Sequence, residues 1–273
     1  MSSLRSISAS IIQGSAIGPA SYVVNASDLH AVTDGNELCK YADDTYIIIP
    51  AVNAGSRSAE LCSITDWACK NNLKLNLAKS QEIIFIDKRR KVNFSAPVIM
   101  PELQRVQVIK ILGVILTNGL SVSLHVQTVI TSCAQTLYAL RVLRAHGLCQ
   151  SALQIIFRAV VVAKLMYGSS AWWGFASATD RQKLKAFLRR SVRAGFYTPD
   201  PEYDFHELCN EADHRLFNII LQSEYHVLEQ LLPPALPQTY DFRKRPHTRQ
   251  IPNRCSYLTD CNFLIRMLFA DSY

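Results

Sequence analysis

Two adjacent aspartates, Asp43 and Asp44, are the residues of this sequence whose type and spacing could most directly support chemistry. They lie between two strand-like runs, residues 38–41 and 46–49, which predict a β-hairpin with an acidic tip. Neighbouring carboxylates repel each other, and a hard divalent cation such as Mg²⁺ would offset that repulsion. Two such ions roughly 3.5 to 4 Å apart can clamp the attacking and leaving oxygens of a phosphoryl transfer. Asp-Asp is also ordinary turn chemistry, so the pair alone leaves both interpretations open.

The elements that must position this pair follow an α+β pattern over residues 1–120. Apolar residues at three- and four-residue steps predict helices, and short runs bounded by turn residues predict strands. A proline suits the first turn of a helix, so one helix is expected to begin at Pro19. The remaining expected elements are a helix over 58–71 and strands over 7–12, 81–86, 92–99 and within 106–116.

Beyond residue 120 the pattern becomes helical, with helices expected over 126–140 and 151–166 and a third beginning at Asp180. The third helix is strongly basic, because no acidic residue follows Asp180 within it. Such a face suits the phosphates of a nucleic acid, although a merely solvated surface would have the same composition. Its cationic residues are Arg181, Lys183, Lys185, Arg189, Arg190 and Arg193.

Composition adds few constraints. The 273 residues contain 29 Lys and Arg against 22 Asp and Glu, a net charge of +7 that fits a polyanionic partner and also many soluble proteins. The eight cysteines include no C-x-x-C pair, which argues against a disulfide scaffold and a zinc ribbon. Polar residues interrupt the uncharged stretches and no secretory signal is recognisable. We therefore expect no membrane span and an intracellular location, in the nucleus or cytoplasm.

Further motifs surround the aspartates in a fixed order. In sequence they are Gln13-Gly14-Ser15, Tyr41-Ala42-Asp43-Asp44, Asn72-Leu73-Lys74-Leu75-Asn76 with Lys79-Ser80, Leu112-Gly113, Ala171-Trp172-Trp173-Gly174 and the segment 262–268. This ordered set resembles the palm motifs and later segments of reverse transcriptases from non-LTR (LINE-type) retrotransposons, over nearly the whole chain.

The resemblance implies an α+β fold in three parts. Residues 1–120 would form a partial reverse-transcriptase palm, an antiparallel sheet with packed helices. Residues 121–195 would form a helical thumb-like domain. Residues 196–273 would form a C-terminal helical segment with a Pro-rich linker and a basic arm. The implied activity is RNA-directed DNA synthesis with Mg²⁺, or alternatively Mn²⁺, from an RNA template, a DNA primer and deoxynucleoside triphosphates.

The resemblance also assigns roles to individual residues. Asp43 would be a metal ligand and Asp44 its acidic neighbour, with Tyr41 close to the primer end. Gln13 and Gly14 would line the pocket for the incoming nucleotide.

Other assignments compete with plainer interpretations. Lys79 would neutralise the triphosphate or protonate the departing pyrophosphate, or it is a solvated lysine after a turn. Leu112-Gly113 would approach the primer, or Gly113 is an ordinary strand glycine. The six cations of the basic helix would contact template and primer phosphates. Trp172 and Trp173 could stack on bases, but core packing is favoured.

One departure from the family concerns the first catalytic aspartate, which precedes the Gln-Gly-Ser motif in that family. Only twelve residues precede Gln13 here, so this aspartate and the fingers are expected to be missing. Two-metal catalysis needs that carboxylate, and we therefore expect the chain alone to be inactive. A non-catalytic nucleic-acid-binding remnant and a functionless product of a decayed transposon copy are the alternatives. The oligomeric state is left open.

Overall fold

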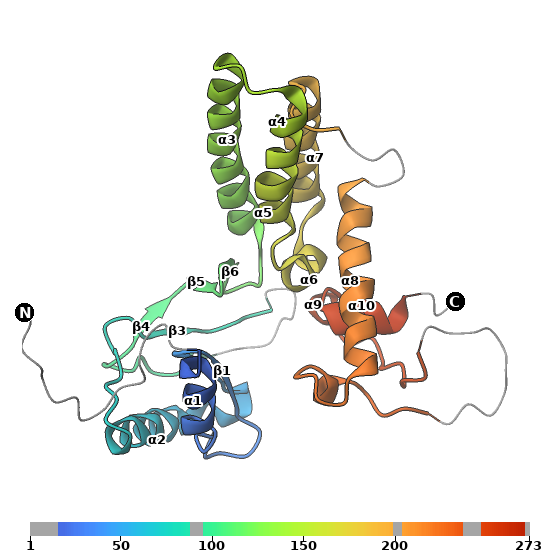
Figure 1. Cartoon of the computed structure of the whole chain (residues 1–273). Helices are drawn as coiled ribbons and strands as arrows, with labels where there is room; N and C mark the ends of the chain where they lie inside the picture. The colour runs from blue at the N-terminus through green and yellow to red at the C-terminus, as the bar shows by residue number, and fades with distance from the viewer. Residues whose placement is uncertain (1–15, 88–94, 199–203, 237–246, 271–273) are drawn as a thin grey trace, which may run out of the picture. The chain divides into compact units, whose positions relative to one another are not determined.

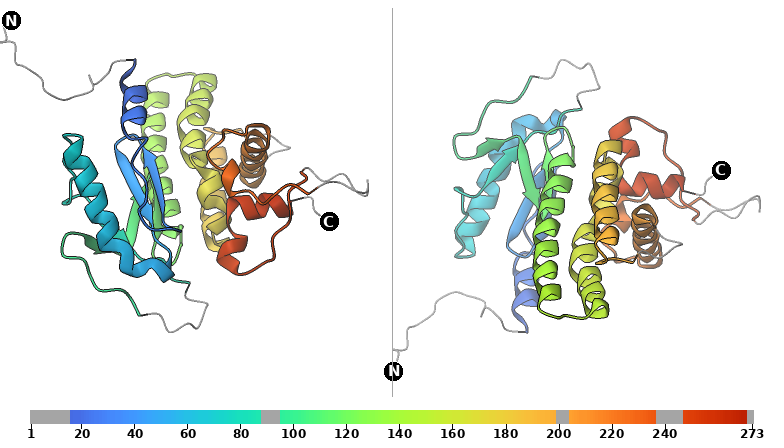
Figure 2. Two further views of the ribbon diagram at one scale, coloured as in Figure 1. Left: turned by 90° about the horizontal axis from the view of Figure 1, so that it is seen from below. Right: turned by 90° about the horizontal axis from the view of Figure 1, so that it is seen from above.

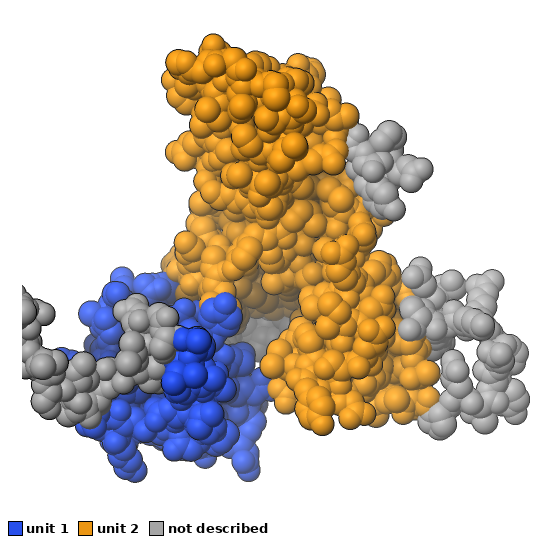
Figure 3. All heavy atoms as spheres, viewed as in Figure 1, with its two compact units in different colours: residues 1–82, 92–106 blue, residues 83–91, 107–273 orange. Residues whose placement is uncertain are grey.

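The computed structural model describes residues 16–87, 95–198, 204–236 and 247–270. It confirms a mixed α+β fold in which helices predominate and the strands form two-stranded pairs (Figure 1). The chain divides into two compact units (Figure 3). Unit 1 comprises residues 1–82 and 92–106, and unit 2 comprises residues 83–91 and 107–273. The expected strand over 7–12, together with Gln13 and Gly14, lies outside the described residues.

In the part of unit 1 that the structure describes there are two α-helices and two short strand pairs. Pro19 lies in the first turn of α1, as expected, where its missing N–H removes no helical hydrogen bond. The predicted acidic hairpin is confirmed as the antiparallel pair β1–β2, in which Tyr41 lies opposite Asp44. The elements are α1 (Gly18–Asn25), β1 (Glu37–Tyr41), β2 (Asp44–Ile48), η1 (Ala51–Ser56), α2 (Arg57–Lys70), β3 (Gln81–Ile83) and β4 (Gln104–Val106).

A buried carboxylate joins α2 to the segment before the hairpin. Helix α2 buries Ile64 as expected, but it also buries Glu60, which is only 1% exposed. The Glu60 carboxylate accepts hydrogen bonds from the backbone N–H groups of Val32 (3.1 Å) and Thr33 (2.9 Å) and from the Asn36 amide (2.6 Å). Burial acts to raise the pKa of Glu60, but these hydrogen bonds outweigh it and the pKa is lowered. Glu60 is therefore held as a charged group.

The prediction of a strand over 92–99 is wrong for residues 95–99, the part that the structure describes, because these residues have no regular secondary structure. Side chains fix this segment instead. Arg57 and Arg105 both donate to the carbonyl of Val98, at 2.9 and 3.2 Å. The same two guanidinium groups clamp the Glu82 carboxylate, at 2.5 and 2.7 Å. The strand expected over 81–86 is correspondingly short and ends at Ile83.

Unit 2 is built on long helices that bury a continuous apolar core. Figures 1 and 2 both show α3 beside the α4–α5 stretch and α7. The residues that fill this core include Val126, Leu140, Leu153, Phe157, Leu184 and Phe187. The elements are β5 (Val108–Ile111), β6 (Val114–Thr117), α3 (Ser123–Ala145), α4 (Gln150–Ile156), the π-helical turn η2 (Phe157–Val162), α5 (Ala163–Met166), α6 (Ser169–Trp172), η3 (Trp173–Phe175) and α7 (Ala178–Arg193). The predicted helices are all present.

One helical stretch of unit 2, Gln150–Phe175, is long and apolar enough to cross a membrane by length and composition. Such stretches also occur as core helices, and Leu153, Phe157, Val161 and Leu165 of this one are fully buried against neighbouring helices. These four residues recur at every fourth position and form an inward face, although only 22% of the apolar window is buried and Ile155 and Val160 are exposed.

The C-terminal part of unit 2 has a second apolar cluster, formed by Phe217, Ile220, Leu232, Phe263, Met267 and Leu268. His247 is buried beside it. The Nδ1 atom of His247 accepts from the backbone N–H of Arg249, so its Nε2–H donates to the carbonyl of Leu268, both at 3.1 Å. The elements are α8 (Phe205–Gln222), η4 (Glu229–Leu231), α9 (Tyr257–Asp260) and α10 (Phe263–Phe269).

Candidate functional site

The acidic pair lies at the tip of the β1–β2 hairpin, on a turn of two residues. Ala42 has a positive φ of 50°, and Asp43 follows it before β2 begins at Asp44. A positive φ at the first central position is typical of a type II′ turn, which normally has glycine there. The backbone thus accepts some strain at Ala42 while presenting two carboxylates at an exposed tip.

Helix α1 lies beside this tip. Burial, and after it the charge of Asp43, raises the pKa of the Tyr22 phenol on α1. Lys40, on β1, donates to the carbonyls of Ala26 and Leu29 (2.9 Å for Leu29), at and just beyond the C-terminal end of α1. This position favours a cation, because the helix dipole is negative there. Lys40 therefore fixes α1 against the hairpin.

The donor chemistry of the tip suits a hard cation, but the ligand set is incomplete. Asp43 and Asp44 supply carboxylate oxygens, the ligands that Mg²⁺ and Mn²⁺ prefer, and Asp44 Oδ2 also accepts a long hydrogen bond from the Tyr46 hydroxyl at 3.4 Å. Within the described ranges, no three His, Cys, Asp or Glu side chains gather closely enough to hold an ion. The two aspartates are suitable ligands for a divalent metal ion, but a metal site needs more ligands than these two side chains provide.

Tyr41 and Lys79 belong to the same unit as the pair. Tyr41 ends β1 opposite Asp44 and is 64% exposed, so its ring is available to a ligand. Lys79 is exposed in a turn that Asn76 closes, with its backbone N–H donating to the Asn76 carbonyl at 3.0 Å. Among the described residues no ion pair joins Lys79 to either aspartate, so the structure does not bring these three into direct contact.

Leu112 and Gly113 form the tip of the second hairpin, β5–β6, in unit 2. Both have positive φ, 45° and 92°, as the two central residues of a type I′ turn require. Tyr167 supports this tip, because its hydroxyl donates to the Leu112 carbonyl at 2.9 Å. A Cβ on Gly113 would meet the Tyr167 ring at 3.0 Å. Gly113 thus serves both the backbone conformation and a close approach.

The basic helix is α7, and its cations divide by orientation. Leu184, Phe187 and Ser191 face the core, which places Arg189 and Arg193 on the opposite, exposed side. The flanking cations Lys183, Lys185 and Arg190 are exposed as well. Five positive side chains therefore share one solvent-facing surface.

The sixth cation, Arg181, turns inward. Its guanidinium lies over the Trp173 ring, 4.7 Å from the centroid, and approaches the Trp173 carbonyl at 3.5 Å. Trp172 and Trp173 are themselves 2% and 4% exposed, so the favoured core-packing interpretation of both tryptophans is confirmed. Arg181 is half-buried and is a weaker candidate for phosphate contact than the other five.

Comparison with known proteins gives one distant relative. Over 213 residues the chain is 24% identical to the RNA-directed DNA polymerase from mobile element jockey of Drosophila melanogaster. The match covers 70% of this chain and 22% of that protein, so the chain spans much less than the length of its relative. No family model matches the chain, and no solved structure does. The chain is thus distantly homologous to a non-LTR retrotransposon reverse transcriptase.

Proposed function

We propose that this chain is part of an RNA-directed DNA polymerase of the non-LTR retrotransposon type. The observation that carries the proposal is the Asp43-Asp44 pair at an exposed, strained hairpin tip, in the expected place among the ordered motifs. In the complete enzyme the template would be RNA, the primer DNA and the substrates deoxynucleoside triphosphates. The distant relationship to the jockey polymerase supports this assignment.

The proposed roles follow the positions of the side chains. Asp43 and Asp44 hold Mg²⁺ or Mn²⁺, and Tyr41 contacts the primer end. When bound, the metal would polarise phosphoryl oxygens and neutralise charge. Lys79 faces solvent, where it could neutralise the triphosphate, and Gln13 and Gly14 would line the nucleotide pocket.

The metal-binding role has a direct test that does not need catalysis. Titration of Mn²⁺ followed by electron paramagnetic resonance should give weak binding that disappears in the Asp43→Asn, Asp44→Asn double variant. Neutralising two exposed carboxylates that are not neighbours in sequence, Asp66→Asn with Glu102→Gln, serves as the charge-matched control. Binding that survives the double variant would remove the pair from the metal site.

We further propose that this chain alone does not polymerise, because a carboxylate pair without a third ligand cannot position two ions. Primer extension by the purified chain should match the Asp43→Ala variant at background level. Robust DNA synthesis that depends on Asp43 would overturn the prediction that the chain alone is inactive. It would at the same time strengthen the proposal that the chain is part of a polymerase.

A second candidate, favoured by the exposed face of α7, is nucleic-acid binding without catalysis. Phosphate contacts release counterions, so affinity should fall steeply with salt, with a slope of about −0.9 per phosphate contact for duplex DNA. The Arg189→Ala, Arg193→Ala double variant should weaken binding and reduce the slope by about two units. Arg215→Ala, on an exposed position of α8, is the control. Affinity that is indifferent to salt would rule this candidate out.

Either function would place the protein with nucleic acid, in the nucleus or the cytoplasm. Fluorescent tagging of the chain in cells tests this, and a tagged chain that concentrates on membranes would contradict it.

A further inference from the structure

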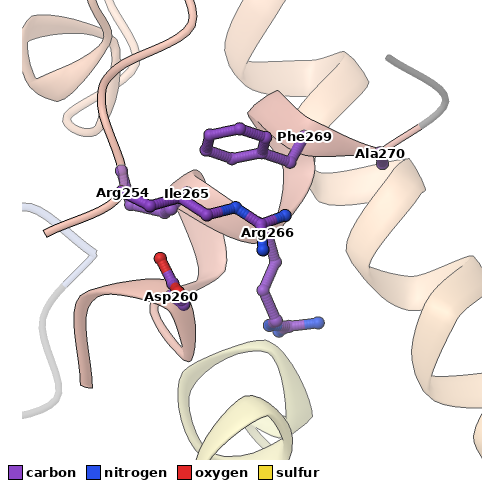
Figure 4. A pocket seen from close by; sticks show the side chains of 6 residues that line it. All are labelled: Arg254, Asp260, Ile265, Arg266, Phe269 and Ala270. Carbon is purple, nitrogen blue, oxygen red and sulfur yellow. The ribbon is translucent and has the colours of Figure 1, made fainter. Parts of the chain in front are cut away.

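A pocket of about 250 Å³ opens in the C-terminal part of unit 2, between α10 and the segment that precedes α9 (Figure 4). The proposed polymerase roles do not use it. Its lining combines charged, aromatic and small apolar side chains, namely Arg254, Asp260, Ile265, Arg266, Phe269 and Ala270.

One wall of the pocket is held rigidly. Arg266 Nη1 pairs with the buried Asp213 carboxylate at 2.8 Å, and Arg266 Nε donates to the Cys261 carbonyl at 3.4 Å. Gly174 packs directly against this wall, since a Cβ there would lie 2.1 Å from the Cys261 oxygen. Arg266 is therefore held in place and fixes the shape of the pocket, but its buried Nη2 atom has no hydrogen-bond partner in the described part of the chain.

The other two polar side chains of the pocket, Arg254 and Asp260, also have atoms without a polar partner among the described residues. The Arg254 guanidinium lies over the Phe269 ring at 4.6 Å, and among the described residues no carboxylate is within ion-pair distance of it. Asp260 Oδ1 is buried and has no hydrogen-bond partner in the described part of the chain. Figure 4 shows Phe269 and Asp260 on different sides of the Arg254 side chain. The pocket thus offers a planar cationic surface with donors and a separate acceptor.

These groups suit a nucleobase better than a phosphate. A phosphate would meet the Asp260 carboxylate, which repels it, and would gain nothing from Phe269, Ile265 or Ala270. An unstacked base can stack on a guanidinium or aromatic plane and form hydrogen bonds along its edges, which is how single-stranded RNA is commonly read. The uncommitted acceptor and donors match a base, which carries both kinds of group.

We propose that this pocket binds one unpaired base of a single-stranded RNA, with guanine preferred. Guanine has two neighbouring acceptors, O6 and N7, that match a guanidinium. It also has two neighbouring donors, N1–H and the N2 amino group, that match a carboxylate. Arg266 Nη2 would supply the donor and Asp260 the acceptor, while the base stacks on the Arg254 guanidinium, which itself lies over Phe269. This inference rests on the proposed nucleic-acid-binding function.

Fluorescence anisotropy with short labelled oligouridylates that differ only in one central base tests the proposal on the full chain. The guanosine oligonucleotide should bind roughly tenfold more tightly than the adenosine, cytidine and uridine versions. Asp260→Asn should reduce this preference to about twofold or less, because the amide cannot accept both guanine donors. Phe269→Leu should weaken binding of every oligonucleotide. Glu211→Gln, the same charge change at an exposed position of α8, should alter nothing.

The outcomes separate this inference from the function on which it rests. If no oligonucleotide binds at low salt, nucleic-acid binding itself fails and the pocket inference fails with it. If all four oligonucleotides bind with equal affinity, and the Arg189→Ala, Arg193→Ala double variant weakens their binding, then nucleic-acid binding by α7 is supported. The proposal of a base-binding pocket is then overturned. A guanine preference that Asp260→Asn leaves intact would also overturn it. Circular dichroism of each variant confirms that the fold is unchanged.

Discussion

At the scale of single residues, Asp180 links the beginnings of two helices. Its buried Oδ2 accepts hydrogen bonds from the hydroxyls of Ser123, on α3, at 2.7 Å and of Ser177, the N-cap of α7, at 2.6 Å. Ser177 Oγ in turn accepts from the Asp180 backbone N–H, and the Ser177 backbone N–H donates to Asp180 Oδ2, both at 3.2 Å, which together form a capping box. Burial acts to raise the pKa of Asp180, but the hydrogen bonds from Ser177 and Ser123 outweigh it and the pKa is lowered.

Asp180→Asn should lower the free energy of unfolding by about 1–2 kcal/mol at neutral pH, because the amide replaces a charged acceptor. A lowered pKa in the folded state stabilises the protein above the unfolded-state value, about 3.9, and this contribution is lost as the pH falls through the folded-state pKa. Denaturant unfolding should therefore show the difference between wild type and variant shrinking below about pH 4. The exposed Asp66→Asn is the control, and a constant difference across pH would contradict the explanation.

Close packing of the backbone around residue 174 requires a glycine at this position. A Cβ there would lie 2.1 Å from the Cys261 carbonyl oxygen and 2.5 Å from Arg266 Nε, and a backbone atom cannot move aside as a flexible side chain can. We expect Gly174→Ala to cost about 1–3 kcal/mol in the free energy of unfolding, measured by denaturant titration. Gly55→Ala, where a Cβ would have open space, is the matched control. Equal stability of the two variants would show that this contact is loose.

At the scale of elements, the two hairpins share an unusual choice of turn residues. Both have two-residue turns with positive φ, at Ala42 in β1–β2 and at Leu112 and Gly113 in β5–β6. Asn or Gly normally occupies positions with positive φ in such turns. In addition, the apolar side chain of Leu112 is 40% exposed to solvent. A non-glycine residue in this region costs of order 1 kcal/mol, and such costs cluster at functional sites.

Relieving the strain should therefore stabilise each hairpin. We expect Ala42→Gly and Leu112→Asn each to raise the free energy of unfolding by about 0.4–1 kcal/mol, measured by thermal unfolding. Gly113→Ala should do the opposite, because its φ is 92° and Tyr167 occupies the space. If Leu112→Asn destabilises the chain, contacts of the Leu112 side chain outweigh the turn preference.

At the scale of the whole molecule, the two units differ in how completely they bury apolar surface. Unit 2 has fully buried core residues such as Val122, Phe157 and Phe196. Among its described residues, unit 1 buries fewer large apolar side chains, and the least exposed, such as Leu29 at 4% and Ile64 at 8%, are less completely buried. Because burial of apolar surface is the dominant stabilising contribution, unit 1 should open at a lower free energy.

Hydrogen exchange measured by mass spectrometry tests this difference. Amides of α2 in unit 1 should exchange faster, by at least tenfold, than those of α3 and α7 in unit 2, since each tenfold step corresponds to about 1.4 kcal/mol of local opening free energy. Comparable protection of α2 and α3 would mean that the chain unfolds as a single cooperative block.

Local patterns in the sequence predicted much of the secondary structure. The proline turn of α1, the acidic hairpin and the three long helices all follow from turn chemistry and apolar periodicity, which act over a few residues. The strand predicted over 92–99 was wrong for its described part, where Arg57, 41 residues away in the sequence, and Arg105, seven residues away, both donate to the Val98 carbonyl. Apolar composition at that segment resembled a strand, but distant side chains decided its path.

The sequence by itself determined which residues could meet phosphate or metal: the Asp43-Asp44 pair and the cations of the helix now identified as α7. Only the tertiary structure decided which of them face solvent, and it turned Arg181 onto Trp173. It also buried Glu60 and assembled the Arg254–Asp260–Phe269 pocket beside Gly174 and Asp213, which no local motif indicated. The physical reason is that burial and pairing depend on contacts between residues far apart in the chain, whereas periodicity and turn chemistry are local.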